Sequence, residues 1–225
     1  MAVSTLRPLV KICGNYHQED VASVSATDVD YMGFVFVASK RQVTIGQVKS
    51  WLDAPGMNQK IVALFVNESI SVIKEVYNAL PVEVIQCHGT ESIEYIKELR
   101  AELDCEIWKV IHADDQALAV MSSFEGLVDG YVVDCKVSGQ WGGTGQSFNW
   151  DLIPSFLEEG KRQSVKVLIA GGVAPQNIDK LVSYQPDGID ISSGVETNGH
   201  KDQNKIEYII ERVSHLANNN ERVSR

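Results

Sequence analysis

Short apolar runs recur along the chain and are separated by stretches with helical periodicity. Several runs are too continuously apolar to leave one face in water, which is typical of parallel strands covered by helices on one side and by a packed interior on the other. The eight runs that predict strands are Leu9–Cys13, Tyr31–Phe36, Ile61–Val66, Glu83–Cys87, Glu106–Ile111, Gly130–Asp134, Val165–Ala170 and Gly188–Ser192.

The stretches between these runs predict amphipathic helices. Apolar residues return every three to four positions in Ser69–Leu80 and again in Ile93–Leu103, so each helix has one apolar stripe to bury on the sheet. A last helix has a similar stripe over Ile206–Val213. We expect this helix to end before the polar run Asn218–Asn220, which leaves a frayed tail from about residue 217.

The number of alternations predicts the fold. Eight strand–helix alternations fit a closed barrel better than an open doubly wound sheet, which usually needs only about five or six strands. We therefore predict an α/β fold with a single (β/α)8 TIM-barrel domain over residues 1–225. Barrel enzymes place their chemistry at the carboxyl ends of the strands, so candidate site residues are sought there.

Composition and charge narrow the class of protein. A chain of 225 residues that is 44% hydrophobic and 22% charged suits one globular domain, and its net charge of −10 disfavours binding to nucleic acid or anionic membranes. No apolar run has the length of a signal peptide or a membrane span, so we expect a cytoplasmic protein. The four cysteines lack CxxC spacing and are interpreted as reduced thiols.

Two strand ends present groups suited to acid–base chemistry. Alternation along the first run puts Lys11 and Cys13 on the same side, where the cation would favour a thiolate. A small buried thiol is the alternative interpretation of Cys13. Asp134 brings a carboxylate to the end of the otherwise apolar sixth run, either as a functional group or as a cap on the following segment.

Other strand ends suggest anion binding. The glycine-containing turns Ala170–Val173 and Asp190–Gly194 follow the seventh and eighth runs, where barrels commonly bind a phosphate, although ordinary turn glycines would look the same. After the second run, Ser39–Arg41 offers a guanidinium that can hold a carboxylate in a bidentate fork, or that is merely solvated surface charge.

Sequence patterns for metals and dinucleotides are missing. Gln86 and His88 end the fourth run and are placed to line the mouth of the barrel, but no HxH or HExxH arrangement accompanies them, so no metal is expected. The segment Gly142–Gly145 lacks the GxGxxG spacing of a dinucleotide loop and is better interpreted as a flexible lid.

Taken in order, these segments resemble the phosphoribosylanthranilate isomerases, enzymes of tryptophan biosynthesis that carry out an Amadori rearrangement. The resemblance extends from Lys11 to about Lys205. Two departures are Cys87, where the family often has Leu, and Lys40, where it often has Pro. The segments that carry the resemblance are Lys11–Gly14, Gly33–Phe36, Phe65–Asn67, Gln86–Gly89, Gly142–Gly145, Ala170–Gly172 and Ile191–Glu196.

The resemblance implies a reaction and a set of roles. The reaction converts N-(5'-phosphoribosyl)anthranilate to 1-(2-carboxyphenylamino)-1-deoxy-D-ribulose 5-phosphate without metal or organic cofactor. Such chemistry needs an ionised base and a protonated acid, so we predict a lowered pKa for the cysteine and a raised pKa for the aspartate. The implied roles are Cys13 as general base, Asp134 as general acid, Arg41 as partner of the anthranilate carboxylate, and Gly172, Ser192, Ser193 and Gly194 as the phosphate cradle.

Three alternatives stay open from the sequence. An indoleglycerol-phosphate synthase or a ribulose-phosphate epimerase would share the two phosphate turns, but the first should show a set of catalytic lysines and the second metal-binding histidines. A non-catalytic barrel that only binds a phosphorylated ligand is the third. The expected partner in every case is a phosphorylated small molecule, and the chain is expected to be a monomer or a homodimer.

Overall fold

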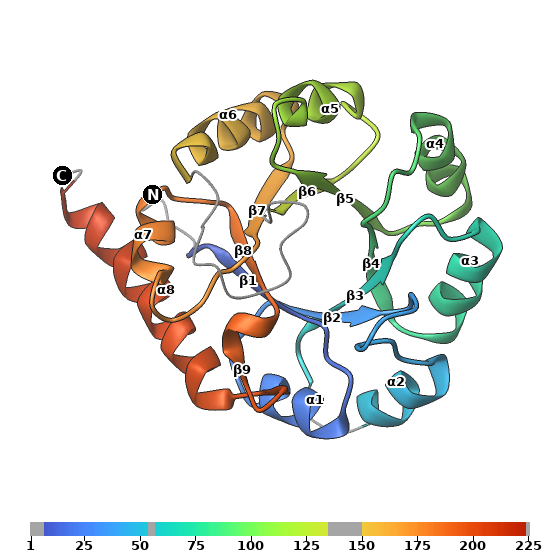
Figure 1. Cartoon of the computed structure of the whole chain (residues 1–225), viewed down its shortest axis with the longest axis horizontal. Coiled ribbons are helices and arrows are strands. Elements are labelled where there is room, and N and C mark those ends of the chain that lie inside the picture. Colours follow the sequence, from blue (N-terminus) through green and yellow to red (C-terminus); the bar gives the residue numbers. More distant parts are fainter. Residues whose placement is uncertain (1–6, 54–56, 135–149, 224–225) are drawn as a thin grey trace, which may run out of the picture.

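Eight parallel strands close into a barrel, and a helix follows each of them on the outside (Figure 1). The computed structural model describes residues 7–53, 57–134 and 150–223, and in the last helix it describes side chains as far as residue 215. The strands of the barrel are β1 Leu9–Cys13, β2 Tyr31–Val35, β3 Lys60–Phe65, β4 Val82–Cys87, β5 Glu106–His112, β6 Gly130–Asp134, β7 Lys166–Ala170 and β8 Gly188–Ile191. The helices are α1 Gln18–Ser25, α2 Ile45–Leu52, α3 Ile70–Ala79, α4 Ile93–Glu102, α5 Ala117–Ser123, α6 Ile153–Gln163, α7 Ile178–Ser183 and α8 Gln203–Val223.

The predicted (β/α)8 TIM barrel is confirmed. Strands pair in chain order, and β1 closes the barrel by pairing with β8. All eight predicted strands are present, with each end within one residue of the predicted position. Within the described residues, no helix has the length and apolar character that crossing a membrane requires.

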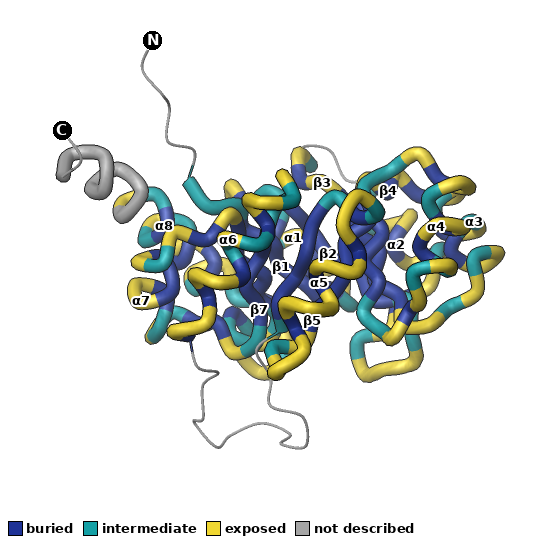
Figure 2. Tube along the Cα trace, turned by 90° about the horizontal axis from the view of Figure 1, so that it is seen from above, coloured by how far each residue is buried: buried dark blue, intermediate teal, exposed yellow. Residues whose placement is uncertain are grey.

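Strand alternation divides the apolar side chains between two layers of core. In β3, Ile61, Ala63 and Phe65 join the large cluster that the helices cover, whereas Val62 belongs to the barrel interior. The interior cluster combines the large side chains of Tyr31 and Trp108 with smaller aliphatic ones. Figure 2 shows the result as buried strands surrounded by helices with exposed outer faces. Both faces of the strands are shielded from water, which explains why their sequences are continuously apolar.

Local sequence explains the start of α2 and the extent of α8. At the start of α2, Thr44 and Gln47 form a capping box in which each side chain satisfies the other's backbone N–H. The prediction that the last helix ends before Asn218 is wrong, because α8 continues to Val223. No Gly or Pro occurs in α8, and Asn, Glu and Arg are all tolerated in a helix, so nothing in the sequence stops it.

A short hairpin lies between β8 and α8, and it was not predicted. A single 3₁₀ turn, η2 (Ser193–Val195), leads into β9 (Glu196–Thr197), which pairs antiparallel with β10 (His200–Lys201). Asn198 and Gly199 form the tip with φ of 53° and 86°, as two-residue hairpin turns require. The hairpin lies beside α1 (Figure 1).

Candidate active site

A cavity of about 690 Å³ opens at the carboxyl ends of the strands. Its volume is in the range that small-molecule sites occupy. Residues from the ends of β1, β2, β3, β4, β6, β7 and β8 line it. The site therefore lies at the face where TIM-barrel enzymes keep their chemistry.

Cys13 ends β1 beside a buried ion pair. As predicted, Lys11 and Cys13 lie on the same side of the strand, and Lys11 Nζ interacts with the thiol. Lys11 Nζ also donates to Asp190 Oδ1 at 2.9 Å, across the β1–β8 seam where the two residues are register partners. The Lys11 side chain is fully buried and that of Asp190 is 8% exposed. The thiol thus has a fixed ammonium next to it.

Burial nevertheless decides the protonation of this thiol. Removal of water raises the pKa of Cys13; Lys11 opposes the rise and Asp190 reinforces it. The prediction of a lowered pKa is therefore wrong, because the loss of hydration outweighs the nearby cation. Burial works against the charge of Lys11 too, but Asp190 and Cys13 more than compensate and raise the pKa of Lys11, which keeps it an ammonium.

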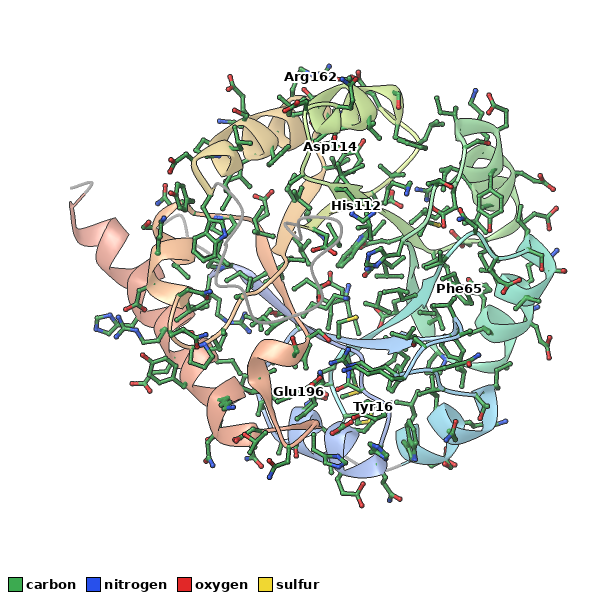
Figure 3. The ribbon with its side chains drawn as sticks, viewed as in Figure 1. Tyr16, Phe65, His112, Asp114, Arg162 and Glu196 are labelled. Atoms are coloured by element: carbon green, nitrogen blue, oxygen red, sulfur yellow. The ribbon has the colours of Figure 1, made fainter. Side chains whose placement is uncertain are left out.

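Asp134 ends β6 and faces the same cavity as Cys13. Its side chain is 14% exposed, and its Oδ2 lies 3.7 Å from Nε2 of His88, which follows β4. The ring of His88 in turn lies 6.0 Å from that of His112, at the end of β5. Figure 3 labels His112. The carboxylate is therefore held near a second titratable group. Its raised pKa stays a prediction.

The turns after β7 and β8 pack against each other through their backbones. Gly171 and Gly172 have φ of 87° and 80°, a region that side chains strain to adopt. A Cβ added to Gly194 would lie 1.8 Å from the carbonyl oxygen of Val173, so glycine is required there. Asn177 braces the first turn by donating to the carbonyl of Gly172 at 2.9 Å. The two turns therefore form one continuous wall of the cavity.

Arg41 enters the cavity from the segment after β2 and is ion-paired. Its Nη2 donates to both carboxylate oxygens of Glu196 at 2.9 Å, and its Nε donates to Oε1 at 3.2 Å. The arginine stem crosses the backbone beside Cys13, because a Cβ added to Gly14 would lie 2.6 Å from Cδ of Arg41. Gly14 also has φ of 73°, so both space and conformation require glycine.

Comparisons with known proteins fit this geometry. Residues 10–212 match the model of the N-(5'phosphoribosyl)anthranilate (PRA) isomerase family. An N-(5'-phosphoribosyl)anthranilate isomerase of Halalkalibacterium halodurans is 52% identical over 217 residues, which cover 94% of this chain and 100% of the relative. The chain belongs to this isomerase family.

Solved structures of the isomerase family share the fold. The phosphoribosyl anthranilate isomerase of Thermotoga maritima superposes with a TM-score of 0.77 at 26% identity, over 92% of this chain and 99% of that one. Another phosphoribosyl anthranilate isomerase was solved in complex with reduced 1-(o-carboxyphenylamino)-1-deoxyribulose 5-phosphate. It has a TM-score of 0.74 at 24% identity and covers 92% of this chain and 99% of that one.

The structure brings the residues singled out by the family resemblance into one cavity. Gln86 and His88, predicted to line the mouth, are also there. Two predictions, the Gly142–Gly145 lid and the thiol of Cys135, lie outside the described residues. The predicted site residues that line the cavity are Cys13, Arg41, Asp134, Gly172, Ser192, Ser193 and Gly194.

Three charged residues of the site received no role from the sequence. Asp190 lies in the predicted glycine-containing turn and Glu196 in a segment that resembles the isomerase family, but nothing indicated that they pair with Lys11 and Arg41. Lys201 was missed altogether because it stands in a polar stretch and looks solvated. The one available signal was Asn198-Gly199, which is typical of a hairpin and would have turned Lys201 back toward Glu196. Among the described residues, no three His, Cys, Asp or Glu are grouped to hold a metal.

Proposed function

We propose that this chain converts N-(5'-phosphoribosyl)anthranilate to 1-(2-carboxyphenylamino)-1-deoxy-D-ribulose 5-phosphate, a step of tryptophan biosynthesis. The observation that carries the proposal is that Cys13 and Asp134 line one cavity together with the glycine turns after β7 and β8. Family membership gives the reaction class, and the cavity supplies both an acid and a base for it. The related protein solved with a reduced analogue of this product also supports it.

The proposed chemistry uses Asp134 first. Its carboxylic acid protonates the ribose ring oxygen, the C1'–O bond breaks, and the ring opens to an iminium ion. The thiolate of Cys13 then removes the C2' proton, and the electron pair forms an enolamine. Tautomerisation oxidises C2' to a ketone and reduces C1' to a methylene, so no external electron acceptor is needed. The acid and base each transfer one proton.

The environment of Cys13 suits a strong base. Its raised pKa means that the neutral thiol predominates at neutral pH, but the thiolate, once formed, binds a proton tightly. Lys11, held charged by Asp190, limits the cost of forming that thiolate. The Lys11–Asp190 ion pair therefore stabilises the thiolate of Cys13 in addition to joining β1 to β8.

Two anion sites would orient the substrate. The backbone of Gly172 and of Ser192–Gly194 is proposed to bind the phosphate, because small residues let N–H groups approach an anion closely. Arg41 is proposed to bind the anthranilate carboxylate. Binding both groups would fix C1' and C2' between the acid and the base.

The test is turnover of fresh N-(5'-phosphoribosyl)anthranilate in the presence of a metal chelator, followed by the loss of its fluorescence. We expect Cys13→Ser and Asp134→Asn each to lower kcat by at least about a thousandfold. Matched controls are Cys105→Ser and Asp114→Asn, which change the same residue types outside the cavity and should keep full activity. Asp114 follows the carboxyl end of β5 and is therefore at the same end of the barrel as the cavity. Figure 3 labels it on the segment that leads to α5.

Other outcomes decide among the alternatives. Binding of the phosphorylated ligand without turnover above the spontaneous rate would favour a non-catalytic barrel. Loss of turnover in chelator would refute the metal-free reaction. Neither the synthase nor the epimerase is favoured, because the family model that matches residues 10–212 is that of the isomerases.

We also propose that the protein works in the cytoplasm as a monomer or a homodimer. The free thiols of Cys13, Cys87 and Cys105 fit a reducing compartment. One Thermotoga maritima relative is described as dimeric. Light scattering of the purified chain across a range of concentrations would decide between the two states.

A further inference from the structure

The β9–β10 hairpin carries the carboxylate of Glu196 and the ammonium of Lys201, which lie beside β1, the strand that ends at Cys13. Glu196 and Lys201 are register partners across the hairpin, and their side chains are ion-paired at 2.9 Å. Glu196 is 10% exposed and Lys201 is fully buried. Figure 3 shows Glu196 on the inner side of the hairpin, on the same side of the barrel as Tyr16. The hydroxyl of Tyr16 donates to the carbonyl of Gly199 at 2.7 Å and fixes the hairpin tip.

Lys201 connects this carboxylate to the backbone at Cys13. Its Nζ donates to the carbonyl of Cys13 at 2.8 Å, to that of Ser192 at 3.1 Å, and to Glu196 Oε1. An ammonium has three protons, so these three acceptors satisfy it fully. The position of Glu196 is thereby tied to the ends of β1 and β8.

Glu196 in turn occupies only one edge of the Arg41 guanidinium. A guanidinium offers a side edge, made by Nε and one Nη, and an end edge made by the two Nη groups. Glu196 accepts from Nε and Nη2, which is the side edge. No residue in the described part of the chain accepts a hydrogen bond from Nη1. The end edge therefore keeps donors for a second carboxylate.

The local charge favours such a second anion. Arg41 and Lys201 share the single carboxylate of Glu196, which leaves one positive charge over when both cations are ionised. Burial lowers the pKa of Lys201, and Glu196 opposes that fall. Burial disfavours ionisation of Glu196, but Lys201 and Arg41 lower its pKa overall, so it stays an anion. An incoming carboxylate would balance the remaining charge in a partly desolvated place, where charge-assisted hydrogen bonds are strong.

We propose that Glu196 is a positioning residue for substrate specificity: it holds the side edge of Arg41 so that the end edge receives the substrate's aryl carboxylate. This inference rests on the proposed function, because it assumes that Arg41 binds the anthranilate carboxylate. In this proposal the β9–β10 hairpin sets the orientation of the Arg41 side chain, although Arg41 itself belongs to the segment after β2. It also explains why Arg41 is ion-paired within the site that it is expected to serve.

The test compares two substrates that differ only in the carboxylate: N-(5'-phosphoribosyl)anthranilate and N-(5'-phosphoribosyl)aniline. We expect Glu196→Gln to lower kcat/KM for the anthranilate compound by about 10- to 100-fold, mainly through KM. For the aniline compound the loss should stay below about threefold. A merely structural role would lower kcat/KM equally for both substrates.

A matched control separates the carboxylate from the hairpin. Lys205 Nζ donates to the backbone carbonyl of Glu196 at 2.7 Å, so Lys205→Met removes a bond to the same residue and leaves its carboxylate in place. This variant should keep the preference for the anthranilate compound. Thermal unfolding of all variants shows whether they fold.

The outcomes distinguish this inference from the proposed function. If Arg41→Lys removes the preference for the carboxylate and Glu196→Gln does not, Glu196 is not the positioning residue. If Arg41→Lys leaves the preference for the anthranilate compound unchanged, Arg41 does not bind the substrate carboxylate, and the inference about Glu196 is refuted as well. Equal losses for both substrates in Glu196→Gln would overturn the inference alone.

Discussion

A Lys11→Met substitution would leave the carboxylate of Asp190 without its ammonium. The Nζ–Oδ1 distance is 2.9 Å, and the two side chains are 0% and 8% exposed. Breaking a buried ion pair by removing one partner costs about 3–5 kcal/mol, because the remaining charge is uncompensated. Asp190 also borders the cavity and keeps some access to water, so we expect the lower end of this range, about 3 kcal/mol.

This loss should be visible in thermal unfolding. For a domain of this size, 1 kcal/mol shifts the midpoint by about 2–4 °C, so the Lys11→Met protein should melt about 6–12 °C lower at pH 7.5. Circular dichroism and calorimetry would measure the shift. The double variant Lys11→Met/Asp190→Asn removes both charges and should recover most of the loss.

Two results would refute this reasoning. A midpoint that falls by less than about 2 °C in Lys11→Met would mean that the ion pair contributes almost nothing to stability. A double variant no more stable than the single one would mean that lost packing of the lysine stem, and not an unpaired charge, causes the effect.

The remaining predictions concern the thiol and the phosphate turns. Burial raises the pKa of Cys13, so the rate of its alkylation by iodoacetamide should increase about tenfold per pH unit between about pH 7 and 9. The measurement uses the Cys135→Ser variant, and a rate that levels off below about pH 8 would contradict the prediction. Gly194→Ala should raise KM by about tenfold or more, since its Cβ would collide with the Val173 carbonyl and move the turn. In contrast, Gly46→Ala meets open space in α2 and should leave KM unchanged while adding up to about 1 kcal/mol of stability.

Much of the barrel could be predicted from the sequence, because strand identity depends on local patterns. Runs such as Gly130–Asp134 are apolar on both faces, and only a covered parallel sheet accommodates that pattern. The end of α8 could not be placed in the same way, since a polar stretch without Gly or Pro tolerates either helix or coil. At Cys13 the neighbouring Lys11 alone suggested a lowered pKa, but the effect of burial is larger and raises it.

The site residues that stand at strand ends could be predicted from the sequence, whereas the ion pairs between distant residues could not. Cys13, Asp134 and the turn glycines stand at strand ends, so the fold alone gathers them. The pairing of Arg41 with Glu196 joins residues 155 positions apart, and no local pattern encodes it. Lys201 illustrates the same limit in part, because the Asn198-Gly199 turn indicates its approach to Glu196, whereas its hydrogen bond to the carbonyl of Cys13 depends on the closure of the barrel.

The seam between β1 and β8 has a consequence for how the protein matures during synthesis. Cys13 is made well before Asp190, which keeps Lys11 charged beside it, and before Lys201, which donates to its carbonyl. A ribosome-bound chain that stops before Asp190 therefore carries the thiol without the charges that set its chemistry. Catalytic competence should appear abruptly, only once the last strand and the hairpin have left the ribosome.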